Sequence, residues 1–539
     1  MSFVKWNPRP RTRIRDFMLK LLPVPSTHPS VIIKNQHTYM GEVAETDEYF
    51  RSEIALLNYS DATLKSPFSP LCILIHQEGH TSASESDPSP ISQHQQDQHP
   101  KDAWLPITES RNGNAYFAAF HILNSNIGFQ ALMLPVAFPT LGWAWGSVCL
   151  SVAFVWQLYA IFLLVQLHES VPGIRYSRYL FLAMAAFGKR LGKVAALFPV
   201  MYLSGGSCVM LIITGGGTMK LLFKTLCDSE RCNAHSPSGA EWFLVFTCVA
   251  ILIAQLPNLN SMAAVSLVGA VTAITYCTLF WALSVKKGRP NDISYSPSLS
   301  QHSTPVAKIG DILNAVGIIM LSFRGHNLLL EIQGTLPSNL DDKTSKGPMR
   351  RGVSISYILI SMCVFPLAIA GFWAYGNQIN DGGLFTSFPI FHKKQVTKFS
   401  MGAIYVLVII HCLSSYQIYG MPVFDNLEIK YTSIKNRKCP RWVRTCFRLF
   451  FGGLTFFIAV TFPFLPSLGA LLGSFTLVPL TYAYPCFMWL SLKKPQRGGA
   501  VWCFNLALGS LGMLLSALLV AAAIRNLVDK GLTANFFKP

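Results

Sequence analysis

The stretch IIMLSFRGHNLLLEIQGTLPS, residues 318–338, begins and continues like a membrane-buried helix but carries polar groups at its centre. Residues 324–327 read Arg-Gly-His-Asn, and Glu331 follows one turn later. An ionisable side chain in hydrocarbon costs several kcal/mol unless it lines a cavity or meets a partner. The stretch therefore predicts a functional cavity inside a membrane domain.

The composition of the whole chain agrees with a membrane protein. Of its 539 residues, 51% are hydrophobic and only 13% are charged, whereas soluble domains carry about 25% charged residues. The mean hydropathy is +0.37. The net charge of +18 comes from Lys and Arg in a polar tail and in short loops, which is typical of membrane topology. We expect a polytopic protein in a lipid bilayer that binds no nucleic acid.

Apolar runs long enough to cross a bilayer, about 17 to 25 residues, recur from Asn114 onward. Eleven are expected, at about 115–138, 143–167, 194–219, 241–257, 262–284, 309–333, 353–375, 398–422, 446–463, 466–491 and 501–524. Residues 1–110 contain no such run and are rich in polar residues, so they are predicted to form a disordered cytosolic tail. The predicted transmembrane domain covers 111–526, and 527–539 form a short C-terminal tail.

Basic residues in the connections predict the orientation of the chain. Two connections on the side of the N-terminal tail, 175–193 and 430–444, are strongly basic, and basic loops stay in the cytosol. An odd number of spans then places the C-terminus outside the cell. Cys227 and Cys232 lie in an expected extracellular loop, where they are either disulfide-bonded or two free thiols.

Helix-weakening residues interrupt two spans that lie five spans apart. The first span reads Asn-Ser-Asn-Ile-Gly at 124–128, and the sixth breaks at 322–326. Backbone that leaves a helix at membrane depth is tolerated where it is buried in protein or lines a wet cavity. Breaks at corresponding places of two five-span halves predict an inverted-repeat secondary transporter with its site at the midplane. Close helix packing by small residues is the alternative.

The ends of the half-helices predict the substrate class. Free amides at the half-helix that begins near Ile127 and Gly128 suit a carboxylate, and carbonyls freed near Leu123 and Ser322 suit an ammonium group. Together they describe an α-amino acid. Tyr202 of the third span is expected at the cavity wall, although helix packing explains it equally well. The predicted substrate-binding residues are Asn124, Ser125, Asn126, Ile127, Gly128, Ser322, Phe323, Arg324, Gly325, His326 and Tyr202.

Three histidines at membrane depth, His121, His326 and His411, and the carboxyl of Glu331 are candidates for carrying a coupled proton. His326 is the first choice because it adjoins the second break, and His411 on the eighth span is the second. Glu331 is the alternative to a histidine, since a buried carboxyl can shuttle a proton. The alternatives are a neutral hydrogen-bonded ring for each histidine and an ion pair or helix cap for Glu331. Ser414 and Ser415 offer hydroxyl ligands for sodium, but the absence of an acidic neighbour favours protons.

Several strings resemble the plant amino acid/auxin permease family, and most closely its lysine/histidine transporter-like branch. They are WLPITESRNGNAYFAAFH (104–121), LPVAFPTLGW (134–143), GHNLLLEIQGTLPS (325–338), GFWAYGN (371–377) and SSYQIYGMPVFDNLE (414–428). The resemblance covers roughly residues 103–539. It implies an all-α fold of the amino acid–polyamine–organocation transporter type, with interrupted helices 1 and 6. It also implies proton-coupled uptake of amino acids across the plasma membrane, driven by the proton gradient with no cofactor.

Two departures from the family pattern bear on the substrate. Ser125 and Asn126 precede a single Gly128 where the family usually shows a small-Gly-small-Gly pattern, so Asn126 takes over a flexible position. Arg324 stands where many relatives carry a small or aromatic residue, and its cation favours neutral or acidic substrates over lysine. The alternatives are an auxin or other organic-acid carrier, a channel and a non-transporting amino acid sensor. The sequence shows no enzyme motif or metal-ligand array, and no obligate protein partner is expected.

Overall fold

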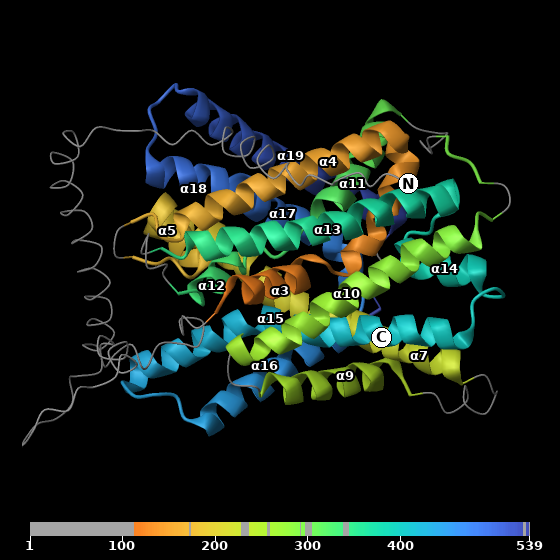
Figure 1. The fold of residues 1–539 in the computed structure, drawn as a ribbon, viewed down its shortest axis with the longest axis horizontal. Coiled ribbons are helices and arrows are strands. Elements are labelled where there is room, and N and C mark those ends of the chain that lie inside the picture. The colour runs from red at the N-terminus through yellow and green to blue at the C-terminus, as the bar shows by residue number, and fades with distance from the viewer. Residues whose placement is uncertain are drawn as a thin grey trace, which may run out of the picture. The chain divides into compact units, whose positions relative to one another are not determined.

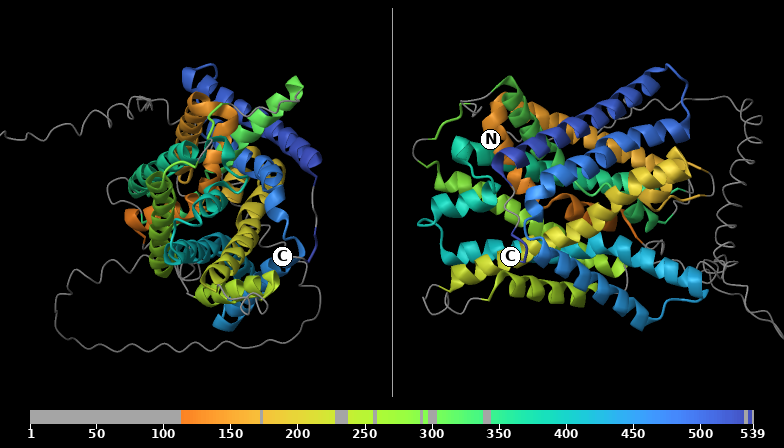
Figure 2. Two further views of the ribbon diagram at one scale, coloured as in Figure 1. Left: turned by 90° about the vertical axis from the view of Figure 1, so that its right-hand side faces the viewer. Right: turned by 180° about the vertical axis from the view of Figure 1, so that it is seen from behind.

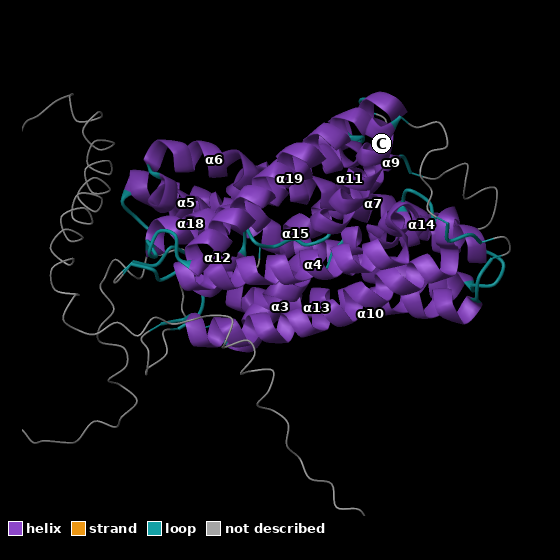
Figure 3. Cartoon of the chain, turned by 90° about the horizontal axis from the view of Figure 1, so that it is seen from above, coloured by secondary structure: helices purple, strands orange, loops and turns teal. Residues whose placement is uncertain are grey.

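The computed structural model describes residues 113–171, 174–227, 237–255, 259–290, 293–296, 304–337, 344–531 and 535–537. The chain divides into two units, Met1–Pro90 and Ile91–Pro539, and all described residues belong to the second. Their regular structure is entirely helical, with no β-strand in the described ranges (Figure 3). The predicted tail at 1–110 lies outside the described residues.

Helices occupy all eleven predicted spans. In chain order they are α3 (Ala115–Asn126) with η5 (Phe129–Ala137); α4 (Phe138–Leu167); α6 (Lys189–Met201), η6 (Tyr202–Gly206) and α7 (Ser207–Leu226); α9 (Gly239–Ala254); α10 (Leu259–Lys287); α11 (Pro305–Leu321) with α12 (Leu329–Gly334); α13 (Lys346–Tyr375); α15 (Lys398–Lys435); α16 (Arg441–Thr461); η8 (Leu465–Leu468), α17 (Gly469–Val478), η9 (Pro479–Ala483) and α18 (Tyr484–Lys493); and α19 (Ala500–Lys530). Figure 1 shows α4, α13, α10 and α15 running side by side, as their contacts confirm.

Eight helical runs among the described residues are each long and apolar enough to cross a membrane alone. The other three spans are α9, which has 16 residues, and the first and sixth, which are divided into shorter helices. One of the eight runs joins the end of the first span to the second. Within it, Gly142 has φ 73° and ψ 178°, a conformation that glycine adopts without strain. This residue separates the two spans where the hydropathy pattern predicted a boundary.

The two interrupted spans lie against each other in opposite directions. At one end, the backbone N–H of Gly113, just before α3, donates to the carbonyl of Thr335 at the end of α12, at 2.9 Å. In the middle, the hydroxyl of Ser322 donates to the carbonyl of Gln130 at 3.3 Å. The two breaks therefore meet, as an inverted repeat of five plus five spans requires. The predicted fold class is confirmed.

Two further α-helices lie in the connections that the structure describes, and they were not predicted. They are α5 (Tyr179–Phe187) and α14 (Gly383–His392), which are too short to span a bilayer. Figure 1 and the right-hand view of Figure 2 place them at opposite ends of the helices. The helix α5 packs closely on α6, because a Cβ at Gly192 would stand 2.4 Å from the carbonyl oxygen of Ala183.

The C-terminal ends of α7 and α19 test two further predictions, a disulfide and the end of the membrane domain. Cys227, which follows α7, is disulfide-bonded. Its expected partner Cys232 lies outside the described residues, so that pairing stays a prediction. The helix α19 continues to Lys530, past the predicted end of the membrane domain at 526.

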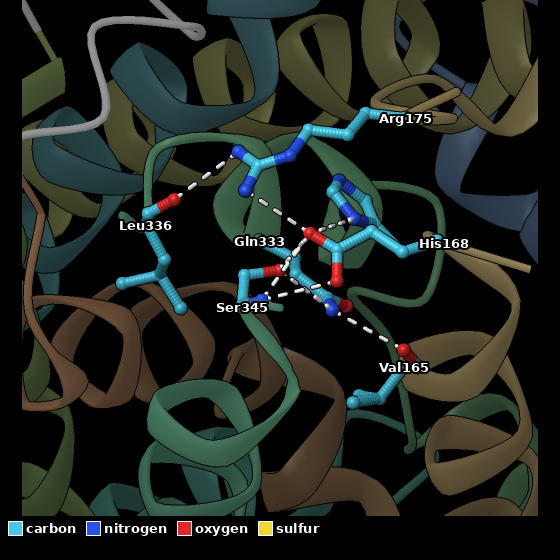
Figure 4. A network of polar contacts seen from close by, with 7 residues as sticks. Val165, His168, Arg175, Gln333, Leu336 and Ser345 are labelled. Atoms are coloured by element: carbon cyan, nitrogen blue, oxygen red, sulfur yellow. Dashed lines mark hydrogen bonds and ion pairs between the residues drawn. The ribbon is translucent and has the colours of Figure 1, made fainter. Parts of the chain in front are cut away.

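A polar network ties the end of α4 to α12 and to the start of α13 (Figure 4). The Glu169 carboxylate accepts hydrogen bonds from the backbone N–H of Ser345 at 3.0 and 3.2 Å and from the Ser345 hydroxyl at 3.0 Å. It also pairs with Arg175 at 3.1 Å. Gln333 of α12 donates to the carbonyl of Val165 and to the Ser345 hydroxyl, both at 3.2 Å. The second half of the sixth span is thereby held against α4 and α13.

The charge of Glu169 is fixed by this network. Burial by itself raises the pKa of the Glu169 carboxyl, but the neighbouring His168 and the hydrogen bonds from Ser345 outweigh it and lower the pKa to about 2. Its place at the N-terminus of α13 adds a favourable helix dipole. Glu169 therefore stays ionised at physiological pH and supports the structure rather than carrying a proton.

Candidate functional site

A cavity lies where the first break faces α7, α10 and α15. It contains about 500 Å³ of empty space when the part open to solvent is included. Six of the residues predicted from the sequence line it: Asn124, Ser125, Ile127, Gly128, Arg324 and His411. The lining residues come from both interrupted spans and from the third, fifth and eighth spans.

The first break presents free backbone N–H groups. Ile127 and Gly128 have extended backbone between α3 and η5, with φ −82° and −134°. As a result, the amides of residues 128–130 donate to no acceptor in the described part of the chain. The amide of Ile127 does donate to the carbonyl of Leu123 itself, at 3.0 Å. The remaining free amides at a helix start suit a carboxylate.

The carbonyl groups at the end of α3 are bonded by hydroxyls of α15. Ser415 donates to the Asn124 backbone carbonyl at 3.2 Å and lies 3.1 Å from its side-chain oxygen. Tyr419 donates to the carbonyl of Ser125 at 2.8 Å. The Asn124 side chain in turn donates to the Ser414 hydroxyl at 2.7 Å. These bonds satisfy the backbone where the helix is interrupted, and they engage both hydroxyls considered as sodium ligands.

Arg324 places a cation in the cavity. Its guanidinium donates to the side-chain oxygen of Gln130 at 2.9 Å and to the Ser207 hydroxyl at 2.6 Å. The guanidinium carbon lies 5.4 Å from the centre of the Tyr419 ring, at the distance of a cation–π contact. None of the cavity-lining residues is acidic, and Arg324 forms no ion pair among the described residues. The positive charge therefore lies uncompensated beside the free amides.

The second break is shaped by Gly325 and packs directly on the first. The φ angle of Gly325 is 86°, which is favourable only for glycine. A Cβ at this position would stand 2.8 Å from the Ser125 hydroxyl and 2.9 Å from the side-chain nitrogen of Asn126. Six predicted residues do not line the cavity and instead shape the breaks or pack behind it: Asn126, Ser322, Phe323, Gly325, His326 and Tyr202.

Three of the candidates for proton coupling occupy different places. His411 lines the cavity, with Nδ1 3.1 Å from the Gly269 carbonyl and Nε2 3.3 Å from the Ser415 hydroxyl. His326 is fully buried away from the cavity, and its Nε2 lies 3.2 Å from the carbonyl of Gln157. Glu331 is buried in α12, also outside the cavity. Of the three, only His411 contacts the space that a substrate would occupy.

The cavity contains residues that the sequence analysis missed. Gln130 and Phe129 come directly after the first break, so their position beside Gly128 was the available signal. Tyr276 of α10 and Thr214 of α7 also line the cavity. Their helices carry no interruption at these positions, so no feature of the pattern distinguishes them from packing residues.

Comparison with known proteins identifies the family. Residues 111–525 match the model for transmembrane amino acid transporter proteins. The chain is 53% identical to Lysine histidine transporter-like 8 of Arabidopsis thaliana, over 82% of this chain and 84% of that protein. It is 46% identical to Lysine histidine transporter-like 7 of the same plant, over 85% of this chain and 95% of that protein.

Solved structures give only a weak likeness. A substrate-bound, outward-open Na⁺-coupled sialic acid symporter aligns with 81% of this chain and 93% of its own, at 12% identity and a TM-score of 0.45. The family match and the relatives show that the protein is a multi-pass membrane transporter rather than an enzyme. The chain belongs to the transmembrane amino acid transporter family, in the lysine/histidine transporter-like branch of the plant amino acid permeases.

Proposed function

We propose that the protein is a proton-coupled symporter that carries neutral and acidic amino acids across the plasma membrane by alternating access. The observation that carries this proposal is the cavity at the first break, where free amides lie beside the uncompensated cation of Arg324. The amides bind the α-carboxylate. The carbonyl oxygens of Asn124 and Ser125 each keep a second lone pair for the ammonium group.

Arg324 determines which side chains the cavity accepts. Two like charges about 4 Å apart repel by about 4 kcal/mol at the effective dielectric of a protein surface, so a lysine side chain near the guanidinium is disfavoured. A second carboxylate is favoured, since arginine binds carboxylates with two parallel hydrogen bonds. An auxin or other organic acid is the second candidate substrate, because the free amides and Arg324 both favour an anion.

His411 is the proposed proton carrier. It lies at the cavity and connects through Ser415 to Asn124 at the break, so its protonation and the position of the half-helix influence each other. Sodium coupling is disfavoured because Ser414 and Ser415 are hydrogen-bonded to Asn124 and no lining residue is acidic. Protons from the gradient are thus the proposed driving force, with no cofactor.

The proposed orientation follows the basic connections. The helix α5, in the connection 168–188, and the end of α15, which leads into 436–440, lie at the same end of the molecule in Figure 1. Basic loops are retained in the cytosol. This end is therefore the proposed cytosolic side, with the tail 1–110 on it and the C-terminus outside the cell.

The test is uptake of labelled amino acids in oocytes that express the protein. Lysine, histidine, glutamate, alanine and an auxin are compared at about pH 5.5 and about pH 7.5, on either side of the usual histidine pKa, with and without sodium. We expect acid-stimulated, sodium-independent uptake of alanine and glutamate, with lysine roughly tenfold lower, which corresponds to about 1.4 kcal/mol.

Each other outcome would contradict a specific part of the proposal. Lysine uptake equal to alanine uptake would refute the selectivity assigned to Arg324. A requirement for sodium would refute proton coupling. Uptake of the auxin alone would favour the organic-acid carrier, and no flux from a protein shown at the cell surface would favour a sensor.

A further inference from the structure

Gln130 joins the two interrupted spans at the cavity. It lies in the first turn of η5, and its side-chain oxygen accepts the 2.9 Å hydrogen bond from Arg324. Its backbone carbonyl accepts the 3.3 Å hydrogen bond from Ser322. One residue of the first break therefore holds two residues of the second, and one of these is the cation of the cavity.

Arg324 has only neutral hydrogen-bond partners, which is unusual for an arginine at membrane depth. Buried guanidinium groups are commonly paired with a carboxylate, which compensates the charge. Here both hydrogen-bond partners, Gln130 and Ser207, are neutral. They fix the direction of the guanidinium but leave its charge in place. Its other N–H groups donate to no acceptor in the described ranges, so they stay available to a ligand.

We propose that Gln130 is a positioning residue that maintains the charge selectivity of the cavity, because it orients Arg324 with a neutral acceptor where a carboxylate would cancel the charge. This inference rests on the proposed function above. It assigns the preference for neutral and acidic amino acids to the pair of positions 130 and 324 rather than to Arg324 alone.

Gln130→Glu tests the proposal with almost no change in shape. The new carboxylate stands at hydrogen-bond distance from the guanidinium and forms an ion pair with it. Relative to alanine uptake, we expect glutamate uptake to fall roughly tenfold and lysine uptake to rise roughly tenfold. The measurement is uptake of the three labelled amino acids, expressed as ratios at equal surface amounts of protein.

Two matched variants separate charge from position. Gln130→Met has a similar length but no acceptor, so Arg324 loses one hydrogen bond and keeps its charge. We expect its glutamate KM to rise a few-fold while its lysine uptake, relative to alanine, stays as low as in the wild type. Arg324→Gln removes the cation and should admit lysine as Gln130→Glu does.

The outcomes distinguish this inference from the proposed function. Wild-type protein that takes up no amino acid would refute the proposed function and, with it, this inference. Wild-type protein that transports amino acids, together with unchanged ratios in Gln130→Glu, would refute the inference alone. Equal admission of lysine by Gln130→Met would also overturn it, since charge would then not be the cause. If Gln130→Glu loses all uptake, thermal stabilisation of the purified protein by glutamate and by lysine provides the same comparison.

Discussion

Gly325→Ala is expected to reduce amino acid uptake more than roughly tenfold while the protein still reaches the membrane. With a φ of 86°, position 325 costs a residue with a Cβ about 1 to 2 kcal/mol. The added methyl group would also stand 2.8 Å from the Ser125 hydroxyl and 2.9 Å from the Asn126 side-chain nitrogen. Either these two side chains must turn away or the second break must move from the first, and Arg324 adjoins that segment. Uptake per molecule at the cell surface is the measurement.

Gly453→Ala is the matched control for this variant. Gly453 lies within α16, and a Cβ there would meet nothing within 4 Å. The same substitution should therefore leave uptake within about twofold of wild type, because surface substitutions away from special features change stability little. Wild-type uptake by Gly325→Ala would show that transport does not need the two breaks to meet.

His411→Gln is expected to remove the acid stimulation of uptake. Glutamine can hydrogen-bond to the Gly269 carbonyl and the Ser415 hydroxyl, which are the partners of His411, but it cannot take up a proton. Uptake at about pH 5.5 should then fall roughly tenfold, to the level seen at about pH 7.5. Exchange of labelled for unlabelled amino acid across the membrane should persist, because exchange requires no net movement of protons.

His121→Gln provides the matched control for the coupling prediction. His121 is also a buried histidine, but it lies in α3 outside the cavity, with Nδ1 2.7 Å from the Ser266 hydroxyl. It should keep the acid stimulation. If uptake by His326→Gln loses its pH dependence while uptake by His411→Gln keeps it, the proton carrier is His326 and not His411.

The positions of the breaks could be predicted because hydropathy and local chemistry determine them. A run such as 124–128, with two asparagines, a serine and a glycine at lipid depth, has few physical explanations other than an interrupted helix or close packing. The eleven spans follow from apolar length in the same way. In both cases the signal lies within one segment of sequence.

The composition of the cavity could be predicted only in part, because it depends on the path of the backbone after each break. Past Gly325 the chain is not helical until Leu329, so helical periodicity cannot say which way His326 faces, and it faces Gln157 rather than the cavity. The role of Gln130 depends on a partner far away in the sequence, Arg324. Short helices such as α5 were not predicted, because their apolar stretches are too short to be recognised as membrane spans.

Purified protein in sodium-free proteoliposomes tests most directly whether this cavity couples amino acid transport to protons. With the outside made acidic, labelled alanine should accumulate inside above its external concentration, and a protonophore should abolish the accumulation. Alanine that only equilibrates across the membrane, with or without the pH gradient, would contradict proton-coupled symport.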